Sequence, residues 1–444
     1  VEEIKKPAKQ APPQLYDLTT LQREAGNRFG FSARNTLGIA QSLYERHKLL
    51  TYPRTDAKCL PEDYIGIVRG HLAGFAKAKP NASLASEAIA ASAKVLSNDW
   101  VTPNKRIFNN AKISDHFAII PTGKIPAGGL KEQEQKIYDL VTRRFVAIFF
   151  PSAEFENTRR ITRIAEDSFL TTGKILVVPG YLEVFGRRPG VATEKDELVP
   201  AQTGEEAQTK EVILKGEHTK PPARYTEATL LSAMETAGKR VDDDELREAM
   251  SERGLGTPAT RAAIIEGLIA HKYVFRHEQQ KRDLVVSNKG LALIDLLEDI
   301  GIEALTSPEL TGEWEYKLKQ MEAGELSREV FMGEIKSLAR DIVERTVGKM
   351  TELANRNYPD LEAICPSCGT TTLKQTDGNY ECTGADCKFK LNKYIASHKL
   401  VPAEAKALLE KGRVGPFEDF KNRFGQPFVA EIQMAEGKRG AWKP

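Results

Sequence analysis

Hydrophobic residues recur every three or four positions along three stretches of the first 150 residues, which predicts three amphipathic helices. These stretches run from Leu18 to Phe29, from Ser32 to His47 and from Glu132 to Phe149. Their apolar stripes are expected to pack into a core, and Ser32 suits the N-cap of the second helix. The two longer stripes consist of Leu37, Ala40, Leu43 and Tyr44, and of Ile137, Leu140, Val141, Phe145 and Ile148.

After Phe155 the pattern changes to short runs rich in β-branched and aromatic residues, which predicts strands up to about Leu214. A charged loop that contains glycine and proline interrupts these strands between Gly186 and Lys210. Helical periodicity returns from Tyr225 to Gly348.

One helix in the second helical region has a clear start. Thr257 can cap it, Pro258 suits its first position, and its pattern ends near Ala270. A hairpin-like pair of runs follows, Tyr273 to Arg276 and Asp283 to Val286. A helix followed by such a hairpin is compatible with a winged-helix module.

Composition is that of a globular protein of several domains. The 444 residues are 41% hydrophobic and 28% charged, enough for three or four domains. Neither an apolar run of about 20 residues nor a signal peptide is visible, which predicts a cytoplasmic location away from membranes. The net charge is only +2, so affinity for nucleic acid would have to come from local patches.

Four of the five cysteines form two close pairs, Cys365 with Cys368 and Cys382 with Cys387. The spacing C-x2-C, thirteen residues, C-x4-C is typical of a zinc ribbon, in which two turns bring four thiolates around one structural Zn²⁺. Two disulfides are the alternative, and a cytosolic protein rarely keeps them. The fifth cysteine, Cys59, is expected to be an ordinary thiol.

A tyrosine and an arginine two positions apart, Tyr52 and Arg54, carry the candidate chemistry. Pro53 fixes its own backbone and favours an extended conformation at Tyr52, so the two side chains share one face. Arg54 could then hold a phosphate while the tyrosine oxygen attacks it. An isolated Tyr-x-Arg is more often a buried tyrosine beside a surface arginine, so the surrounding sequence has to decide.

Seven stretches in this sequence, in the same order, resemble those of the type IA DNA topoisomerases, most closely the topoisomerase III branch. The stretches are Tyr16 to Gln22, Thr36 to Lys48, Leu50 to Asp56, Ser114 to Thr122, Tyr225 to Leu230, Gly254 to Ala262 and Glu309 to Glu315.

The resemblance implies a mainly α, multi-domain fold with a β-rich arch segment, winged-helix-like modules, a zinc ribbon and a small C-terminal repeat. The expected parts are a linker (1–12), a gate domain (13–154), the arch segment (155–214), a helical single-strand-binding domain (215–348), a second linker (349–362), the ribbon (363–397) and the repeat (398–444). Family members begin with a further domain that binds Mg²⁺ and carries a catalytic lysine. The chain reaches Tyr52 without it, so that domain is expected to be missing or supplied in trans.

The implied activity is ATP-independent cleavage of one DNA strand through a 5′-phosphotyrosine at Tyr52, followed by strand passage and religation. No G-x-x-x-x-G-K-[ST] loop is present, which disfavours ATP-dependent relatives. Arg54 and His116 are expected to stabilise the reacting phosphate. The implied contacts to single-stranded DNA are Glu227, Thr257, Thr260 and Arg261.

A second function stays open, that of a non-catalytic single-strand-binding remnant of a topoisomerase. A helicase is a possible partner in either case. Aromatic and basic residues of the tail could stack on single-stranded bases, or the aromatic ones could instead form the core of a small repeat. These residues are Phe417, Phe420, Phe424, Phe428 and Trp442, with Lys421, Arg423, Lys438 and Arg439.

Overall fold

The structure is a computed structural model that divides into two compact units. It describes residues 1–79, 86–126, 128–185, 201, 203–206, 208–237, 254–277, 282–302, 305–354, 358–376, 378–422, 427–436 and 442–443. Unit 1 comprises Val1–Ala223, Glu227–Ser232 and Gly256–Ala263, and unit 2 comprises Arg224–Thr226, Ala233–Leu255 and Ile264–Pro444. No helix in these described ranges is long and apolar enough to cross a membrane.

Unit 1 contains a helical body, residues 11–152. Its helices are α1 (Leu18–Phe29), α2 (Ala33–Glu45), α3 (Ile65–Ala76), α4 (Ser86–Ser97) and α5 (Glu132–Ala147), with short 3₁₀ turns η1 (Glu62–Tyr64) and η2 (Asn110–Lys112). The predicted cap at Ser32 is confirmed, because its hydroxyl accepts a hydrogen bond from the Asn35 amide at 3.1 Å. Two hydrophobic clusters fill the body, one around Leu72, Phe75 and Phe145 and the other around Leu21, Leu43 and Tyr138.

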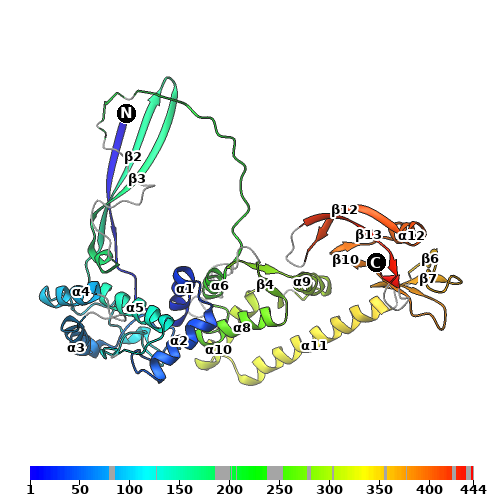
Figure 1. Ribbon diagram of the computed structural model, residues 1–444. Helices are drawn as coiled ribbons and strands as arrows, with labels where there is room; N and C mark the ends of the chain where they lie inside the picture. The colour runs from blue at the N-terminus through cyan, green and yellow to red at the C-terminus, as the bar shows by residue number, and fades with distance from the viewer. Residues whose placement is uncertain are drawn as a thin grey trace. The chain divides into compact units, whose positions relative to one another are not determined.

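The other part of unit 1 is an antiparallel sheet with the strand order β1-β2-β3, followed by turn η3 (Gly180–Phe185) (Figure 1). The strands are β1 (Glu2–Gln10), β2 (Ala153–Ile164) and β3 (Asp167–Val178). The sequence predicted a linker over residues 1–12, but residues 2–10 form a strand that pairs with β2 along its whole length. The arch segment therefore obtains a partner strand from the first residues of the chain itself.

Ion pairs explain how the Lys/Pro-rich segment becomes a strand. On one face of the sheet Arg160 lies 2.6 Å from Glu3, and Lys9 lies 2.8 Å from Glu154. These partners are more than 140 residues apart in the sequence, so the pattern within either segment does not predict the ion pairs. The exposed pairs contribute little each, whereas the Glu3 carboxylate is almost fully buried against Arg160.

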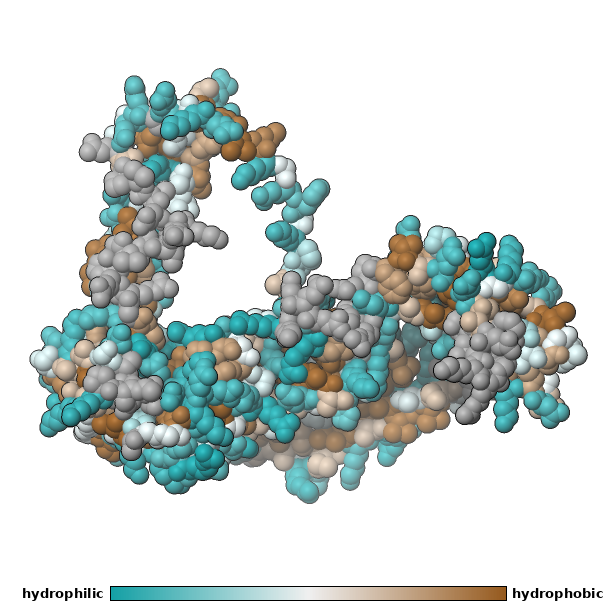
Figure 2. Space-filling view, viewed as in Figure 1, coloured by the Kyte–Doolittle hydropathy of each residue, from teal (hydrophilic) through white to brown (hydrophobic). Residues whose placement is uncertain are grey.

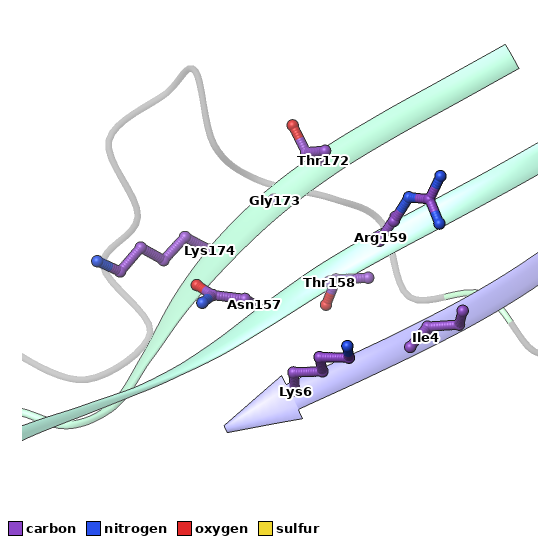
Figure 3. A pocket seen from close by; sticks show the side chains of 8 residues that line it. All are labelled: Ile4, Lys6, Asn157, Thr158, Arg159, Thr172, Gly173 and Lys174. Carbon is purple, nitrogen blue, oxygen red and sulfur yellow. The ribbon is translucent and has the colours of Figure 1, made fainter. Parts of the chain in front are cut away.

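The opposite face of the same sheet carries three cations. Lys6, Arg159 and Lys174 line a pocket of about 450 Å³ together with Asn157, and Figure 3 shows them on neighbouring strands. Within the described residues none of the three cations forms an ion pair with a carboxylate. Hydrophobic residues are also visible at the end of the sheet in Figure 2, where Phe169 and Leu170 are exposed.

Unit 2 begins with helices and a small hairpin. Strands β4 (Val274–Arg276) and β5 (Leu284–Val286) pair antiparallel where the sequence predicted a hairpin, after helix α8 (Pro258–Ala270). The following helices are α9 (Asn288–Ile300), α10 (Glu309–Glu322) and α11 (Arg328–Ala354). Helix α6 (Glu227–Glu235), like α8, begins in unit 1 and ends in unit 2.

The C-terminal part of unit 2 is a four-stranded sheet joined to a small repeat. The sheet has the order β6-β7-β8-β9, with β6 (Leu361–Ile364), β7 (Thr372–Gln375), β8 (Asn379–Cys382) and β9 (Lys390–Asn392). The repeat contains β10 (Tyr394–Ile395), β11 (His398–Lys399), α12 (Pro402–Lys411), β12 (Arg413–Lys421), β13 (Pro427–Gln433), β14 (Ala435–Glu436) and β15 (Trp442–Lys443).

The tail aromatics divide between core and surface. Phe420 is 2% exposed, and Phe417 stacks on the ring of His398 with centroids 4.0 Å apart, so both belong to the core of this part. Phe428 is 39% exposed and stays available for base stacking. Phe424, Arg423, Lys438, Arg439 and the side chain of Trp442 lie outside the described residues.

Candidate active site

Two extended segments of the helical body hold the candidate nucleophile. The segment around Tyr52 runs antiparallel to the segment that contains His116, since the Thr51 amide donates to the Ile120 carbonyl at 3.0 Å and the Thr55 hydroxyl donates to the His116 carbonyl at 2.7 Å. The Leu18 amide donates in turn to the Thr55 carbonyl at 3.0 Å. Tyr52, Arg54 and His116 are thus brought together from two motifs about 60 residues apart.

The Tyr52 ring lies between two other rings. Its centroid is 4.3 Å from that of His116 and 5.4 Å from that of Tyr44, which meets it edge-on at 80°. The side chain is half-buried, and its hydroxyl has no hydrogen-bond partner among the described residues. Both neighbours therefore restrict the direction of the ring and leave its oxygen available to a substrate.

Arg54 is exposed, and helix α2 orients it. With the amide oxygen of Gln41 turned toward the guanidinium, that oxygen accepts hydrogen bonds from two Arg54 nitrogens at 3.0 and 3.3 Å. The remaining N–H groups of Arg54 have no partner among the described residues, so a phosphate could accept from them. Gln41 and Tyr44 are three residues apart on α2, so one helix face contacts both members of the Tyr52/Arg54 pair.

A pocket of about 140 Å³ lies beside these residues. It is lined by Arg54 and His116, by Thr257 and by Pro258 at the start of α8, all within unit 1. The start of α8 adds the partial positive charge of a helix N-terminus, which favours a phosphate. The exposed carboxylates of Asp56 and Asp115 also line the pocket and weaken this positive field.

Thr257 and Thr260 bond to each other at the start of α8. The Thr260 hydroxyl accepts from the Thr257 amide at 2.9 Å, and the two hydroxyls lie 3.1 Å apart. Thr257 also lines the pocket, whereas Thr260 is not among its described lining residues. Of the two threonines, Thr257 is therefore the better placed to contact a DNA strand.

Arg261 is buried, with 3% of its surface exposed. Its guanidinium donates to the Thr19 hydroxyl at 2.9 Å and to the Gly256 carbonyl at 3.0 Å, which joins the start of α8 to the first turn of α1. In this conformation Arg261 holds the site together and has no surface for a direct DNA contact. Burial of this kind gives no signal in the sequence.

Glu227 lies at the opposite end of the same helix that orients Arg54. Its carboxylate accepts from the Ala33 amide at 3.0 Å, at the N-terminus of α2, where a negative charge is favourable. This contact gives Glu227 a structural role that does not require DNA.

A second tyrosine–arginine pair, Tyr16 with Arg144, is less accessible than Tyr52 with Arg54. Tyr16 is 1% exposed, and its hydroxyl bonds to Glu24 and Arg144. Burial raises the pKa of Tyr16 well above its usual value, and the adjacent Glu24 adds to this effect. Tyr16 is therefore neither accessible nor easily deprotonated.

The four clustered cysteines fit a zinc ion. Their sulfurs all lie within 4.8 Å of one another, and the pairs Cys365–Cys387 and Cys368–Cys382 are each separated by 3.7 Å. A tetrahedral site with Zn–S bonds of ~2.3 Å requires sulfurs about 3.8 Å apart. The same distances are far too long for disulfides, for which S–S is about 2.0 Å.

The surroundings of the cysteines favour thiolates at two of the four positions. Hydrogen bonding by Thr371 lowers the pKa of Cys368 to about 5 and also lowers the pKa of Cys382. Burial raises the pKa of Cys365 to about 12. In the described part of the chain this is the one group of side chains suited to a metal.

Gln41 and Tyr44 were not predicted as site residues. Tyr44 was assigned to the apolar stripe of its helix, and Gln41 was not considered, although both lie in the motif from Thr36 to Lys48 that precedes Tyr52. The sequence did contain a signal for these two residues, because a helix that leads directly into an extended segment packs one of its faces against that segment.

Comparison with known proteins agrees with this arrangement. Residues 1–333 match the family model described as DNA topoisomerase, and residues 386–442 match that described as the C-terminal repeat of topoisomerase. The chain belongs to the DNA topoisomerase family.

Among its relatives are proteins named DNA topoisomerase 3. The one from Bacillus cereus is 39% identical over 385 residues, which cover 84% of this chain and 50% of the relative. The one from Bacillus subtilis is 38% identical over 383 residues, with the same shares. The chain thus spans about half the length of the curated relatives it matches.

A solved structure shows a likeness of fold. Full-length topoisomerase I from Thermotoga maritima superposes with a TM-score of 0.53 at 22% sequence identity. The match covers 87% of this chain and 58% of that one.

Proposed function

We propose that the chain carries the strand-cleaving part of a type IA DNA topoisomerase, with Tyr52 as the nucleophile. The observation that carries this proposal is the pocket in which Arg54, His116 and the start of α8 surround the space beside the Tyr52 ring. The Arg54 guanidinium, the His116 ring and the positive end of a helix converge there from three separate segments of the sequence, as binding of a phosphodiester requires.

The proposed step exchanges one phosphodiester for another. The Tyr52 oxygen attacks phosphorus and loses its proton, the bond from phosphorus to the 3′ oxygen breaks, and that oxygen leaves as a hydroxyl after gaining a proton. The product is a 5′-phosphotyrosine, and attack by the 3′ hydroxyl reverses the step. Because the backbone bond energy is kept, no nucleotide hydrolysis is needed, and relaxation or decatenation of DNA follows from passage of another strand.

Arg54 and His116 are the residues we assign to charge stabilisation. Arg54, oriented by Gln41, faces the developing negative charge on the phosphate, and His116 contacts the adjoining phosphate from beside the Tyr52 ring. In this proposal, Mg²⁺ and the acid that protonates the leaving 3′ oxygen are supplied from outside the described residues. Within the described residues, the cysteines form the one candidate metal group.

A second candidate function is binding of single-stranded DNA without cleavage. Both functions use the same pocket, and the sheet cations Lys6, Arg159 and Lys174 would support either by attracting phosphates.

A labelled oligonucleotide separates the two candidates. The full chain is incubated with a 3′-labelled single strand and Mg²⁺, and the products are run on a denaturing gel. We expect label at the mass of the protein plus the cleaved strand, absent in Tyr52→Phe, which should bind the strand as the wild type does. Binding without any adduct would support the second candidate, and an adduct that persists in Tyr52→Phe would overturn the assignment of the nucleophile.

A further inference from the structure

Two threonines hold the two ends of the segment that carries the candidate nucleophile. The Thr51 hydroxyl donates to the Ala118 carbonyl at 3.0 Å and accepts from the Ile120 amide at 2.9 Å. At the other end the Thr55 hydroxyl donates to the His116 carbonyl at 2.7 Å. Both hydroxyls therefore bond to the backbone of the neighbouring extended segment and hold the two segments together.

The three residues between these threonines, Tyr52 to Arg54, are held less directly. Within the part of the chain that the structure describes, they make no backbone hydrogen bond, and Pro53 has no amide hydrogen to donate. The place of the Tyr52 ring relative to the neighbouring segment therefore depends on the two threonines and on side-chain contacts.

Thr55 is the more informative of the two threonines. It is 4% exposed, and its hydroxyl also accepts from the Ala57 amide at 3.1 Å, so the hydroxyl acts both as donor and as acceptor. The Thr55 carbonyl accepts from the Leu18 amide at 3.0 Å. Thr55 thus connects the first turn of α1, its own segment and the backbone of His116.

His116 depends on this connection. It is exposed, its ring lies 4.3 Å from the Tyr52 ring, and its bond to Thr55 is the one hydrogen bond that it makes among the described residues. The preceding Ser114 is also exposed, and its hydroxyl bonds to the Asp56 carboxylate at 3.2 Å. The buried Thr55 hydroxyl is therefore the firm anchor for the backbone that carries the His116 ring.

We propose that Thr55 is a positioning residue for strand cleavage, because it sets where His116 stands beside the Tyr52 ring. This inference rests on the proposed function, in which Tyr52 attacks the phosphate and His116 stabilises it. Thr55 also lines the pocket, but both bonds of its hydroxyl go to protein backbone, so it acts through His116 and not on the DNA. A displacement of about 1 Å at a reacting site can cost about 100-fold in rate.

Three substitutions separate the hydroxyl of Thr55 from its shape. Thr55→Ser keeps the hydroxyl, Thr55→Cys replaces it with a weak donor and acceptor, and Thr55→Val keeps the shape alone. With the full chain, Mg²⁺ and a 3′-labelled single strand, we expect the rate of adduct formation to fall in that order. The fall in Thr55→Val should be about tenfold or more, whereas affinity for the strand should change by no more than about threefold.

Thr36→Val is the matched control for this series. Thr36 is fully buried in the same helical body, and its hydroxyl donates to the Ser32 carbonyl at 3.0 Å within α2. Its loss should lower stability as Thr55→Val does, since each variant removes a buried hydroxyl bond to a carbonyl. The rate of adduct formation should stay at the wild-type value in Thr36→Val.

Nuclear magnetic resonance of the full chain with ¹³C-labelled histidine reports on the position of His116 without cleavage. The ring current of Tyr52 shifts the signal of the neighbouring imidazole, and His116→Gln and Tyr52→Leu identify that signal. We expect Thr55→Val to remove part of the shift, and Thr55→Ser and Thr36→Val to keep it.

The two measurements distinguish failure of this inference from failure of the proposed function. A wild type that forms no adduct would count against the proposed function, and the histidine signal would then decide the role of Thr55. An unchanged signal and rate in Thr55→Val, equal losses in Thr55→Ser and Thr55→Val, or the same losses in Thr36→Val would overturn the positioning role. If Thr55→Val does not fold, the comparison of Thr55→Ser with Thr55→Cys decides in the same way.

Discussion

The amide oxygen of Gln41 accepts two hydrogen bonds from the guanidinium of Arg54, at 3.0 and 3.3 Å. Gln41 belongs to a regular helix and Arg54 to an exposed extended segment, so the helix fixes the direction of a side chain that would otherwise have many rotamers. An arginine oriented before the substrate arrives loses less entropy when it binds a phosphate.

Replacement of Gln41 should therefore slow cleavage without weakening strand binding in proportion. We expect Gln41→Leu to lower the rate of adduct formation by about tenfold, the equivalent of one hydrogen bond to a charged group. The measurement is a time course of adduct formation under conditions in which the chain is active. Gln133→Leu, an exposed glutamine on α5, is the control, and a drop in affinity equal to the drop in rate would contradict an orienting role.

Arg261 should affect stability more than DNA contact. Arg261→Met removes two hydrogen bonds of a buried charged donor and should lower the free energy of unfolding by about 2–4 kcal/mol. Urea unfolding followed by circular dichroism measures the change, with the exposed Arg34→Met as the comparison. Unchanged stability together with weakened DNA binding would show instead that Arg261 reaches the strand.

The cationic face of the sheet should appear in the salt dependence of binding. If Lys6, Arg159 and Lys174 each contact a phosphate, changing all three to glutamine should reduce the slope of log K against log salt by about 2 for single strands. The control changes Lys5 and Lys9, which are paired with Glu156 and Glu154, to glutamine. The same slope in both variants would exclude this face from the DNA interface.

Zinc binding should depend on the four clustered cysteines and not on Cys59. We expect about one zinc ion for each chain by elemental analysis, lost in Cys368→Ser and retained in Cys59→Ser, since Cys59 is buried in the helical body and is not one of the four clustered cysteines. Removal of zinc by a chelator should increase amide exchange in residues 361–392. Full zinc content in Cys368→Ser would refute the four-cysteine site.

The C-terminal repeat should lose stability as pH rises. Burial by itself lowers the pKa of His398, but hydrogen bonds to Asp419 at 2.8 Å and Glu404 at 3.1 Å outweigh it and raise that pKa above its usual value. The stabilisation is therefore complete below about pH 6.5 and is lost as pH rises through the folded-state pKa. Asp419, near Lys421, has its pKa lowered by the same contact and stays ionised throughout this range.

Amide exchange of residues 398–421 at pH 6 and pH 8, corrected for the intrinsic rates, tests this dependence. The difference in local stability between the two pH values should disappear in His398→Gln. It should persist in His271→Gln, which changes an exposed histidine elsewhere in unit 2. A repeat that is equally stable at both pH values in the wild type would show that His398 is neutral when folded.

Local chemistry accounts for the parts of the structure that the sequence predicted well. The first helix was predicted from Leu18 to Phe29 and has those bounds, because apolar spacing and a capping residue suffice to define it. The hairpin after α8 was equally visible. Strand β1 was missed because lysines and a proline hide its alternation, and its stabilising partners lie far along the chain.

The site could be predicted only in part for the same reason. Tyr52, Arg54 and His116 stand in recognisable motifs, and the structure brings them together. The burial of Arg261 and the contact of Gln41 with Arg54 depend on packing between segments, which spacing along one segment does not reveal. The motifs identified which segments form the candidate site, but the contacts that each residue makes there are visible only in the structure.

The pairing of β1 with β2 has a mechanical consequence. Gln10 lies opposite Ala153, so the helical body leaves the sheet and returns to it on adjacent strands. Residues 11–152 are thereby connected to the sheet at two adjacent strand ends, and both connections contain proline, at Pro12, Pro13 and Pro151. Turn η3, which follows β3, packs against the same body, where Arg143 donates to the Val184 carbonyl at 2.8 Å. A force that pulled the sheet away from the helical body would therefore have to break the contacts of η3 before the two connections could act as a hinge.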